Sequence, residues 1–355
     1  MKIIILENSS LAIETIRKDL VKSFLSKYDV KIYSLKLIKQ NKNNEYESKL
    51  DVTELNLLNL FFFLKDCFGA KGLLTFTIRP LLIGFFISLI FPKTNFYPTI
   101  TGTGPLIDSK KIIYRILHFL YPTFLKRAKF VFFHNNADAY HFSKWISKDK
   151  FCIVGGSGIN LKNKLIHKDT YSIPNRPPKI ACFSRLLKDK GIIHFLEATE
   201  RIMQKYKFME GNIFLAGMFW DSNFNSNKIS KDDIEKWIKR GGRFLGQPVN
   251  KEEFYLSLDV LCVPSYREGL SNILLEGGLN ECILLASSVP GCIDIVDDNC
   301  GITFLPRSSK ELFKALEKSL NLSNQNQIKF RLNVKTKIES LFSKDKVIAK
   351  YHERI

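Results

Sequence analysis

Paired cysteines, histidine clusters and long apolar runs are all missing from this chain of 355 residues. Its seven cysteines lie far apart without any C-x-x-C pair, and its six histidines do not gather near them. That spacing argues against a disulfide framework and against a structural metal site, and it is typical of small buried side chains in a reducing compartment. We therefore expect neither a bound metal nor a cofactor.

The lack of a long apolar run excludes a membrane-spanning helix. The most apolar segment, residues 80–92, holds only about a dozen residues between two prolines, whereas a span needs about 20. We expect it to form a buried or interfacial helix. Met1 leads directly into the apolar residues 3–6, which predicts that there is no signal peptide. These features predict a cytoplasmic protein.

Positive charge is what the sequence has in excess. The formal net charge is +19, and residues 1–170 hold 26 Lys and Arg against 13 Asp and Glu. A basic N-terminal half indicates a polyanionic partner, either nucleic acid or an anionic membrane surface, unless the proteome is simply rich in lysine. No basic motif with interleaved aromatics, typical of RNA- and DNA-binding modules, is present, so we expect no nucleic-acid partner.

One basic segment combines its charge with an apolar stripe. Residues 111–129 place apolar side chains at helical spacing and carry Lys126, Arg127 and Lys129 at their end. Such a helix can lie on an anionic membrane, and it can equally be an ordinary amphipathic helix of the fold. The sequence leaves these two interpretations open.

Strands and helices alternate along the chain. A strand, a helix over 11–28 and a second strand are predicted at the start, and the alternation resumes at residue 180 after a proline-rich stretch. This pattern predicts an α/β fold of two Rossmann-like, doubly wound domains facing across a cleft, with ligands at the carboxyl ends of the strands. The expected division is a first domain at 1–168, a linker at 169–178, a second domain at 179–340, and a C-terminal helix at 341–355 packing back on the first domain.

The most informative stretch is the turn after the predicted strand 259–263. Ser271 can cap the helix that follows, whose first N–H groups offer a seat for a phosphate anion. Glu268 lies just before this helix and Glu276 lies inside it, and carboxylates accept hydrogen bonds from sugar hydroxyls. A nucleotide-sugar uses all three features, with Glu276 on the ribose and Glu268 on the transferred sugar. Two glutamates at this spacing also arise by chance, and one near a helix start can simply complement the helix dipole.

Two cations follow the predicted strand 180–183. Arg185 and Lys190 lie on the loop that leads from this strand to a helix over 192–205. A guanidinium and an ammonium at such a place can neutralise the charge that builds on a departing diphosphate. The alternative is a solvated lysine-rich loop, and the carboxylate pair in the same domain favours the diphosphate.

Together these residues resemble the family 4 retaining glycosyltransferases. The similarity covers most of residues 179–305 and rests on short motifs in one order, namely Ser184-Arg185-Leu186, Lys190-Gly191, Leu215-Ala216-Gly217, Phe244-Leu245-Gly246, the turn from Pro264 to Leu270 with Glu276, and Pro290-Gly291. The first half is similar to the branch that assembles lipid-linked surface polysaccharide repeat units, through Arg79-Pro80, Gly102-Thr103-Gly104, His134-Asn135 and Gly156-Ser157-Gly158.

The resemblance implies the GT-B architecture and a set of site residues. The catalytic group would be Arg185 and Lys190 on the donor diphosphate with Glu268 on the donor sugar, while Glu276 would bind the ribose. The rest of the donor site would comprise Gly246, Gly269, Leu270, Ser271 and Asn272. The acceptor site would comprise Thr101, Gly102, Thr103, Gly104, His134 and Asn135. Transfer would proceed by front-face displacement with retention and without a metal.

These implications lead to one main hypothesis and two alternatives. The main one is transfer of a hexose or N-acetylhexosamine from a UDP-sugar to a polyprenyl-diphosphate-linked glycan, in O-antigen or capsule synthesis, at the inner face of the cell membrane. Its acceptor diphosphate and anionic lipid would need the positive charge of the first domain. A nucleotide-sugar epimerase of GT-B fold would need no membrane affinity. A non-catalytic polyanion-binding protein on the same scaffold is the other alternative.

Four segments depart from the family pattern. Asn8-Ser9-Ser10 follows the first strand in place of a glycine-rich loop, and residues 101–104 lack the bulky residue that the branch tends to carry between the glycines. The other two lie in the second half. Glu276 is followed by Gly277-Gly278, and each glycine costs about 1 kcal/mol inside a helix. Asn280-Glu281-Cys282 stands where a glycine and a proline are usual.

Overall fold

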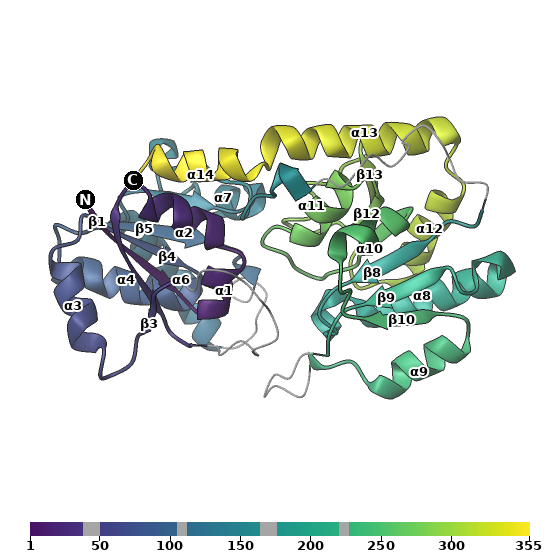
Figure 1. Ribbon diagram of the computed structural model, residues 1–355, viewed down its shortest axis with the longest axis horizontal. Coiled ribbons are helices and arrows are strands. Elements are labelled where there is room, and N and C mark those ends of the chain that lie inside the picture. The colour runs from purple at the N-terminus through teal and green to yellow at the C-terminus, as the bar shows by residue number, and fades with distance from the viewer. Residues whose placement is uncertain (38–49, 105–111, 164–175, 220–226) are drawn as a thin grey trace. The chain divides into compact units, whose positions relative to one another are not determined.

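The computed structural model describes residues 1–37, 50–104, 112–163, 176–219 and 227–355 (Figure 1). The chain divides into two compact units, one formed by residues 1–157 together with 344–355 and the other by residues 158–343. Each unit is built on a parallel sheet whose two faces contribute to separate core clusters. The predicted α/β fold with two Rossmann-like domains is therefore confirmed.

The unit boundaries lie at other residues than the sequence predicts. The first unit runs to Ser157, whereas the predicted end at residue 168 and most of the predicted linker 169–178 lie outside the described residues. The last helix, α14 (Lys344–His352), belongs to the first unit and packs against α2 (Lys18–Leu25) (Figure 1). His352 stacks there on Phe24, with the two ring centroids 4.7 Å apart.

In the described residues of the N-terminal unit, seven parallel strands form one sheet in the order β3-β2-β1-β4-β5-β6-β7. Their bounds are β1 Lys2–Glu7, β2 Asp29–Ser34, β3 Val52–Glu54, β4 Gly72–Phe76, β5 Asn95–Ile100, β6 Val131–Phe133 and β7 Phe151–Ile153. The further helices of this unit are α1 Ser10–Glu14, α3 Leu60–Phe68, α4 Ile78–Ile90, α6 Ile112–Arg127 and α7 Asn136–Phe142.

Strand β1 shows why this sheet is buried on both sides. Ile3 and Ile5 pack into a core cluster with α2 and α14, whereas Ile4 and Leu6 pack into a cluster with α3 and α4. Successive side chains of a strand point to opposite faces, so an unbroken apolar run is what a central parallel strand requires.

The single helix predicted over residues 11–28 is wrong, because two short helices, α1 and α2, occupy this segment. Between them, the hydroxyl of Thr15 donates to the carbonyl of Leu11 at 2.6 Å, and Arg17 lies just before α2. The break leaves the Arg17 guanidinium beside the carboxylate of Glu7 at the end of β1. Apolar spacing at helical period continues through the break, which is why the pattern did not indicate it.

The described part of the C-terminal unit contains a sheet of six parallel strands in the order β10-β9-β8-β11-β12-β13. Their bounds are β8 Ile180–Phe183, β9 Ile213–Ala216, β10 Arg243–Gly246, β11 Val260–Val263, β12 Ile283–Ser287 and β13 Gly301–Phe304. The helices are α8 Ile192–Lys205, α9 Lys231–Lys239, α10 Lys251–Ser257, α11 Asn272–Leu279, α12 Ser309–Leu320 and α13 Asn324–Leu341. Helices α8, α9 and α12 cover one face, and α10, α11 and α13 cover the other.

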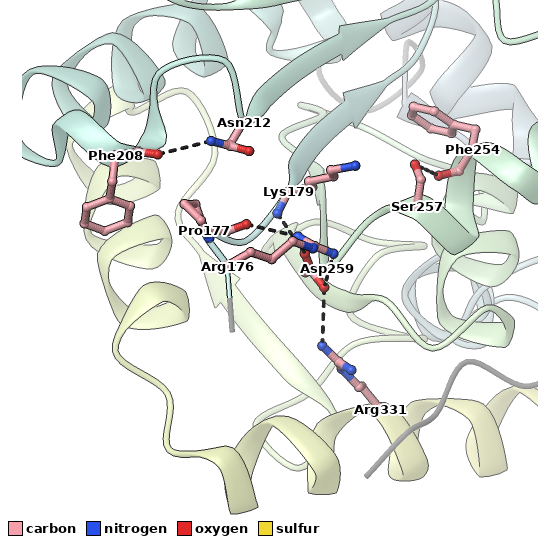
Figure 2. A network of polar contacts seen from close by, with 9 residues as sticks. All are labelled: Arg176, Pro177, Lys179, Phe208, Asn212, Phe254, Ser257, Asp259 and Arg331. Carbon is pink, nitrogen blue, oxygen red and sulfur yellow. Dashed lines mark hydrogen bonds and ion pairs between the residues drawn. The ribbon is translucent and has the colours of Figure 1, made fainter. Parts of the chain in front are cut away.

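A buried carboxylate fixes the amino end of this second sheet (Figure 2). Asp259, just before β11, accepts hydrogen bonds from Arg176 Nη1 at 2.7 Å and from the backbone N–H of Lys179 at 2.8 Å. Arg331 of α13 approaches it from the other side at 3.8 Å. The carboxylate thus ties the segment before β8 to β11 and to α13.

The glycines that depart from the family pattern have a packing role. A Cβ on Gly277 would lie 2.2 Å from Leu261 of β11, and a Cβ on Gly278 would lie 2.5 Å from Ile338 of α13. Helix α11 is therefore pressed between the sheet and α13 more closely than alanine would allow. The cost of two glycines in a helix is offset by that close approach.

Candidate functional site

The predicted donor residues lie at the carboxyl edge of the C-terminal sheet. The loop after β8 carries Arg185 and Lys190, β10 ends at Gly246, and the loop after β11 carries Glu268 to Ser271. Because all strands of this sheet run parallel, these loops emerge at one edge. Arg185 is exposed, and its carbonyl accepts from Leu187 N–H at 2.8 Å.

Two glycines fix these loops against one another. Gly191 has φ +71°, and a Cβ there would lie 2.0 Å from the carbonyl oxygen of Pro264. Gly291 has φ +77°, and a Cβ there would lie 2.7 Å from the carbonyl oxygen of Gly269. Only glycine adopts such backbone angles freely and permits such close approach. Gly191 and Gly291 therefore allow the loop before α11 to pack closely against the loops that carry these two glycines.

Lys190 and Glu268 form an ion pair inside this edge. Lys190 Nζ lies 2.7 Å from Glu268 Oε1, and the same oxygen accepts from Ser265 Oγ at 2.7 Å. The two charged side chains are only 14% and 16% exposed. The backbone of Tyr266 donates to the carbonyl of Asp189 at 2.8 Å, which joins the loops that carry the pair.

Glu276 is held by a different partner. The hydroxyl of Tyr255, on α10, donates to Glu276 Oε2 at 2.7 Å, and Lys251 Nζ lies 3.8 Å from Oε1. Burial, with the neighbouring carboxylate, raises the pKa of Tyr255 well above its usual value, so this hydroxyl stays a donor. Glu276 remains 30% exposed and keeps lone pairs for a ligand.

Helix α11 begins as predicted. Ser271 is its N-cap, and the Ser271 hydroxyl accepts from the N–H of Leu274 at 3.4 Å. The Ser271 N–H in turn donates to the carbonyl of Gly291 at 3.3 Å. The edge therefore combines a helix N-terminus, a lysine and two carboxylates, which are the groups that a sugar diphosphate engages.

The predicted acceptor residues lie at the carboxyl edge of the N-terminal sheet. Residues 101–104 follow β5 and His134-Asn135 follow β6, and these two strands are parallel neighbours. Thr103 donates its hydroxyl to Asp138, whose other oxygen accepts from Asn135 Nδ2 at 2.8 Å. Asn135 also caps α7 by accepting from Asp138 N–H at 2.8 Å. Burial raises the pKa of Asp138.

A buried charged cluster that the sequence did not indicate lies at the same edge. Arg17 Nε lies 3.4 Å from Glu7 Oε2, and Arg17 Nη1 donates to Ser157 Oγ at 2.8 Å. The guanidinium lies over the ring of Phe76, with Arg17 Cζ 4.4 Å from the ring centroid. Burial raises the pKa of Glu7, although the charge of Arg17 opposes the shift. The one feature of the sequence that could have indicated this cluster is Glu7, a carboxylate at the end of the first buried strand.

His134 stands beside this cluster as a neutral base. It is 5% exposed, and burial together with the charge of Arg17 holds the pKa of His134 well below its usual value. Its Nε2 has no hydrogen-bond partner within the described part of the chain. A neutral imidazole at this edge can accept a hydrogen bond from a hydroxyl group.

Among the described residues, no three His, Cys, Asp or Glu side chains gather as metal ligands would. None of the helices in the ranges given above is long and apolar enough to cross a membrane.

Residues 163–345 match the family model described as "Glycosyl transferases group 1". Among curated proteins, the chain is 22% identical over 232 residues to an N,N'-diacetylbacillosaminyl-diphospho-undecaprenol alpha-1,3-N-acetylgalactosaminyltransferase of Campylobacter jejuni. It is 24% identical over 163 residues to the capsular polysaccharide biosynthesis glycosyltransferase CapM of Staphylococcus aureus. These matches cover 62% and 45% of this chain, and only 57% and 41% of the respective relatives.

Solved structures share the fold over nearly the whole chain. HepE of Anabaena, determined in complex with UDP and glucose, superposes with a TM-score of 0.76 at 14% identity, covering 99% of this chain and 98% of HepE. A glycosyltransferase from Rickettsia africae superposes with a TM-score of 0.73 at 15% identity, covering 99% and 97%. At such identities the similarity establishes the fold.

Proposed function

The chain belongs to the group 1 glycosyl transferases, and from that membership we propose that it transfers a hexose or N-acetylhexosamine from a UDP-sugar to a polyprenyl-diphosphate-linked glycan. The proposed reaction is of the family 4 type and retains the anomeric configuration. It would serve the synthesis of a surface polysaccharide such as O-antigen or capsule.

The observation that carries this proposal is the pair of carboxylates around the start of α11. Glu268 is bound to Lys190 on one side of the helix start, and Glu276 is bound to Tyr255 on the other. A nucleoside diphosphate-sugar presents hydroxyls at both ends and two phosphates between them. UDP suits this description, and UDP is also present in the HepE structure.

The proposed chemistry assigns a step to each of these groups. Lys190 and Arg185 neutralise the UDP that departs as the bond between the sugar C1 and the phosphate oxygen breaks. The acceptor hydroxyl forms the new bond to C1 on the same face and gives its proton to the departing phosphate oxygen. Glu268, released from Lys190 by the incoming diphosphate, accepts hydrogen bonds from the donor sugar. Neither step requires a metal or a cofactor.

The acceptor side of the proposal rests on the N-terminal unit. Thr103, Asn135 and His134 offer hydroxyl, amide and neutral imidazole groups at one sheet edge. The Campylobacter relative is named for an undecaprenol-diphosphate-linked substrate. A lipid-linked acceptor requires the enzyme to work at a membrane surface, so we place the protein peripherally at the inner face of the cell membrane.

Exposed apolar side chains on one group of helices support that location. Helices α3, α4 and α6, with the turn before α3, carry large apolar side chains that face solvent, namely Leu57, Leu58, Phe61, Phe62, Phe68, Phe86, Leu89, Ile90, Ile112, Ile113, Ile116 and Phe119. Phe61 is 69% exposed and Phe119 is 81% exposed. Arg115, Lys126 and Arg127 on α6 supply cations near them. Apolar side chains flanked by cations suit an anionic bilayer.

The enzymatic proposal is tested with a panel of labelled UDP-sugars and a polyprenyl-diphosphate monosaccharide. We expect one UDP-sugar to label the lipid, with release of UDP that depends on the acceptor and an α or β linkage that matches the donor. Epimerised donor formed without an acceptor would favour the epimerase instead. An inverted linkage would contradict retention.

The membrane proposal is tested by sedimentation with vesicles. The double variant Phe61→Ser, Phe119→Ser should bind weakly to vesicles of phosphatidylcholine and phosphatidylglycerol. Phe208→Ser, at a 55% exposed position of the C-terminal unit, is the matched control and should bind like the wild type. Equal sedimentation of all three proteins would contradict the membrane role of these helices.

A further inference from the structure

The N-terminal unit contains a hollow at the edge opposite its acceptor residues. Its volume is about 600 Å³, which is within the range of small-molecule sites. Asn95 at the start of β5 and Phe130 just before β6 line it, so it lies at the amino ends of these strands. Residues 101–104 and His134 lie at the carboxyl ends of the same two strands. The hollow is therefore separate from the acceptor edge.

Basic side chains dominate the lining. Five cations come from the end of α6, from the residue before Phe130, from the short turn before β7 and from the C-terminus, namely Lys126, Arg127, Lys129, Lys150 and Arg354. Asp149 and Glu353 are the two carboxylates of the lining, which leaves a formal charge of +3. Within the described residues, no ion pair joins Lys126, Lys129 or Lys150 to a carboxylate.

The helix dipole accounts for only part of this charge. Lys126 and Arg127 lie in the last turn of α6, where cations stabilise any helix. Lys129, Lys150 and Arg354 do not belong to that helix. Arg354 is also held in place, with its guanidinium 4.9 Å from the centre of the Phe130 ring. Like charges from separate segments repel one another, so their gathering indicates that an anion offsets them.

The hollow adjoins the apolar helices. Arg127 Nη2 donates to the carbonyl of Ser88 at 2.5 Å, which joins the end of α6 to the end of α4. Leu89 and Ile90, at that end of α4, are 51% and 61% exposed. A ligand held by the cations would thus have apolar side chains beside it. A phosphate group joined to hydrocarbon chains has this combination of properties.

We propose that this basic hollow at the amino ends of β5 and β6 is a binding site for a phosphodiester or phosphomonoester group, and that its ligand is the headgroup of an anionic phospholipid. Lys129, Lys150 and Arg354 contact the phosphate oxygens. The choice of a lipid headgroup rests on the proposed membrane location, whereas phosphate binding does not depend on it.

The test compares two double variants that each remove two exposed lysines. Lys129→Ala, Lys150→Ala removes cations that line the hollow, and Lys93→Ala, Lys148→Ala removes the same charge outside the lining. Binding is measured calorimetrically to glycerophosphoglycerol, and by sedimentation to vesicles of phosphatidylcholine with or without phosphatidylglycerol. We expect the first variant to bind phosphatidylglycerol vesicles about 20-fold more weakly than the wild type, and the second to change little.

Each outcome decides the proposal. Weaker binding of the Lys129, Lys150 variant to both probes supports a headgroup site. Weaker binding to glycerophosphoglycerol with unchanged vesicle binding keeps the phosphate site and rejects the lipid as its ligand. Equal loss in the two variants would mean diffuse attraction to charge, and would overturn the site, as would no loss in either. No donor sugar is present in these assays, so failure here is distinct from failure of the glycosyl-transfer proposal.

Discussion

Lys190 and Glu268 are bound to each other, with Nζ 2.7 Å from Oε1. Each was predicted separately from the sequence, one for the diphosphate and one for the sugar. The ion pair brings the two side chains together at one edge of the sheet. Each charge has an opposite charge beside it while no ligand is bound. A diphosphate that attracts Lys190 would release the carboxylate at the moment when the sugar hydroxyls arrive.

Replacing Lys190 tests its proposed role in the departure of UDP. Lys190→Ala should lower kcat by about 100-fold or more, because a preorganised cation that faces developing charge contributes on this scale. KM for the donor should change much less. Lys188→Ala, at an exposed position of the same turn, is the matched control and should retain wild-type kinetics. Steady-state kinetics with the identified UDP-sugar measures both constants.

The Tyr255–Glu276 contact predicts a graded effect on donor affinity. Glu276→Ala should raise KM for the UDP-sugar about tenfold, because the charged hydrogen bond that we propose between the ribose and Glu276 is lost. Tyr255→Phe removes only the hydroxyl that positions Glu276, so KM should rise by a smaller factor. Glu253→Ala, on the exposed side of α10, serves as control. A larger effect of Tyr255→Phe than of Glu276→Ala would contradict a positioning role for the tyrosine.

The buried His134 predicts loss of stability in acid. The pKa of His134 is lowered in the folded protein, chiefly by burial and also by Arg17, whereas the unfolded chain binds a proton below about pH 6.5. Stability from this group is therefore full above pH 6.5 and falls as the pH drops. Between pH 6.5 and 5 the free energy of unfolding should fall, by at most about 1.4 kcal/mol per pH unit.

Urea unfolding of the wild type and of His134→Gln at several pH values measures this difference. The variant should lose less free energy of unfolding on acidification than the wild type does. Parallel curves for the two proteins would show that His134 is not the group responsible.

Glu281 offers a test of strain against charge pairing. Its φ is +60°, in the region that favours glycine, and its carboxylate pairs with Lys335 of α13 while only 3% of the residue is exposed. Glu281→Gly relieves about 1 kcal/mol of backbone strain but leaves Lys335 without its partner, which costs about 3 kcal/mol or more. We expect net destabilisation by about 2 kcal/mol in urea unfolding.

A second substitution separates the two terms at this position. Adding Lys335→Met to Glu281→Gly removes the unpaired charge, so the double variant should recover most of the lost stability. If the double variant is as unstable as Glu281→Gly alone, the ion pair is not the source of the loss.

The sequence predicts the C-terminal sheet well and the N-terminal sheet less completely. Strands β8 and β11 and helix α8 lie where the alternation of apolar runs and turns places them. Strand β5 contains Pro98, which lacks a backbone donor and argues against a central strand, so its pattern does not indicate one. The sequence around Pro98 therefore does not predict a strand. In the folded unit, hydrogen bonding to β4 on one side and β6 on the other makes this segment a strand despite the proline.

The candidate site likewise contains features that the sequence predicts and contacts that it does not. Motifs that depend on local backbone, such as the Ser271 cap and the glycines at 191 and 291, can be read from the sequence because their chemistry lies within a few residues. The contacts of Tyr255 with Glu276 and of Arg17 with Glu7 join distant or unmarked positions. No spacing encodes them, because packing of α10 against α11 and the break after α1 create them.

Helix α14, the last helix of the chain, completes a core cluster that also contains side chains of β1, the first strand. Tyr351 is 1% exposed and lies 4.3 Å from Phe132 of β6, measured between ring centroids. On the ribosome, the first 157 residues emerge long before this helix does, and at about 5–20 residues per second the delay is roughly 10–40 s. During that time β6 lacks its covering aromatic ring, so a nascent chain that stalls in the second unit exposes the half-finished core of the first to chaperones and proteases.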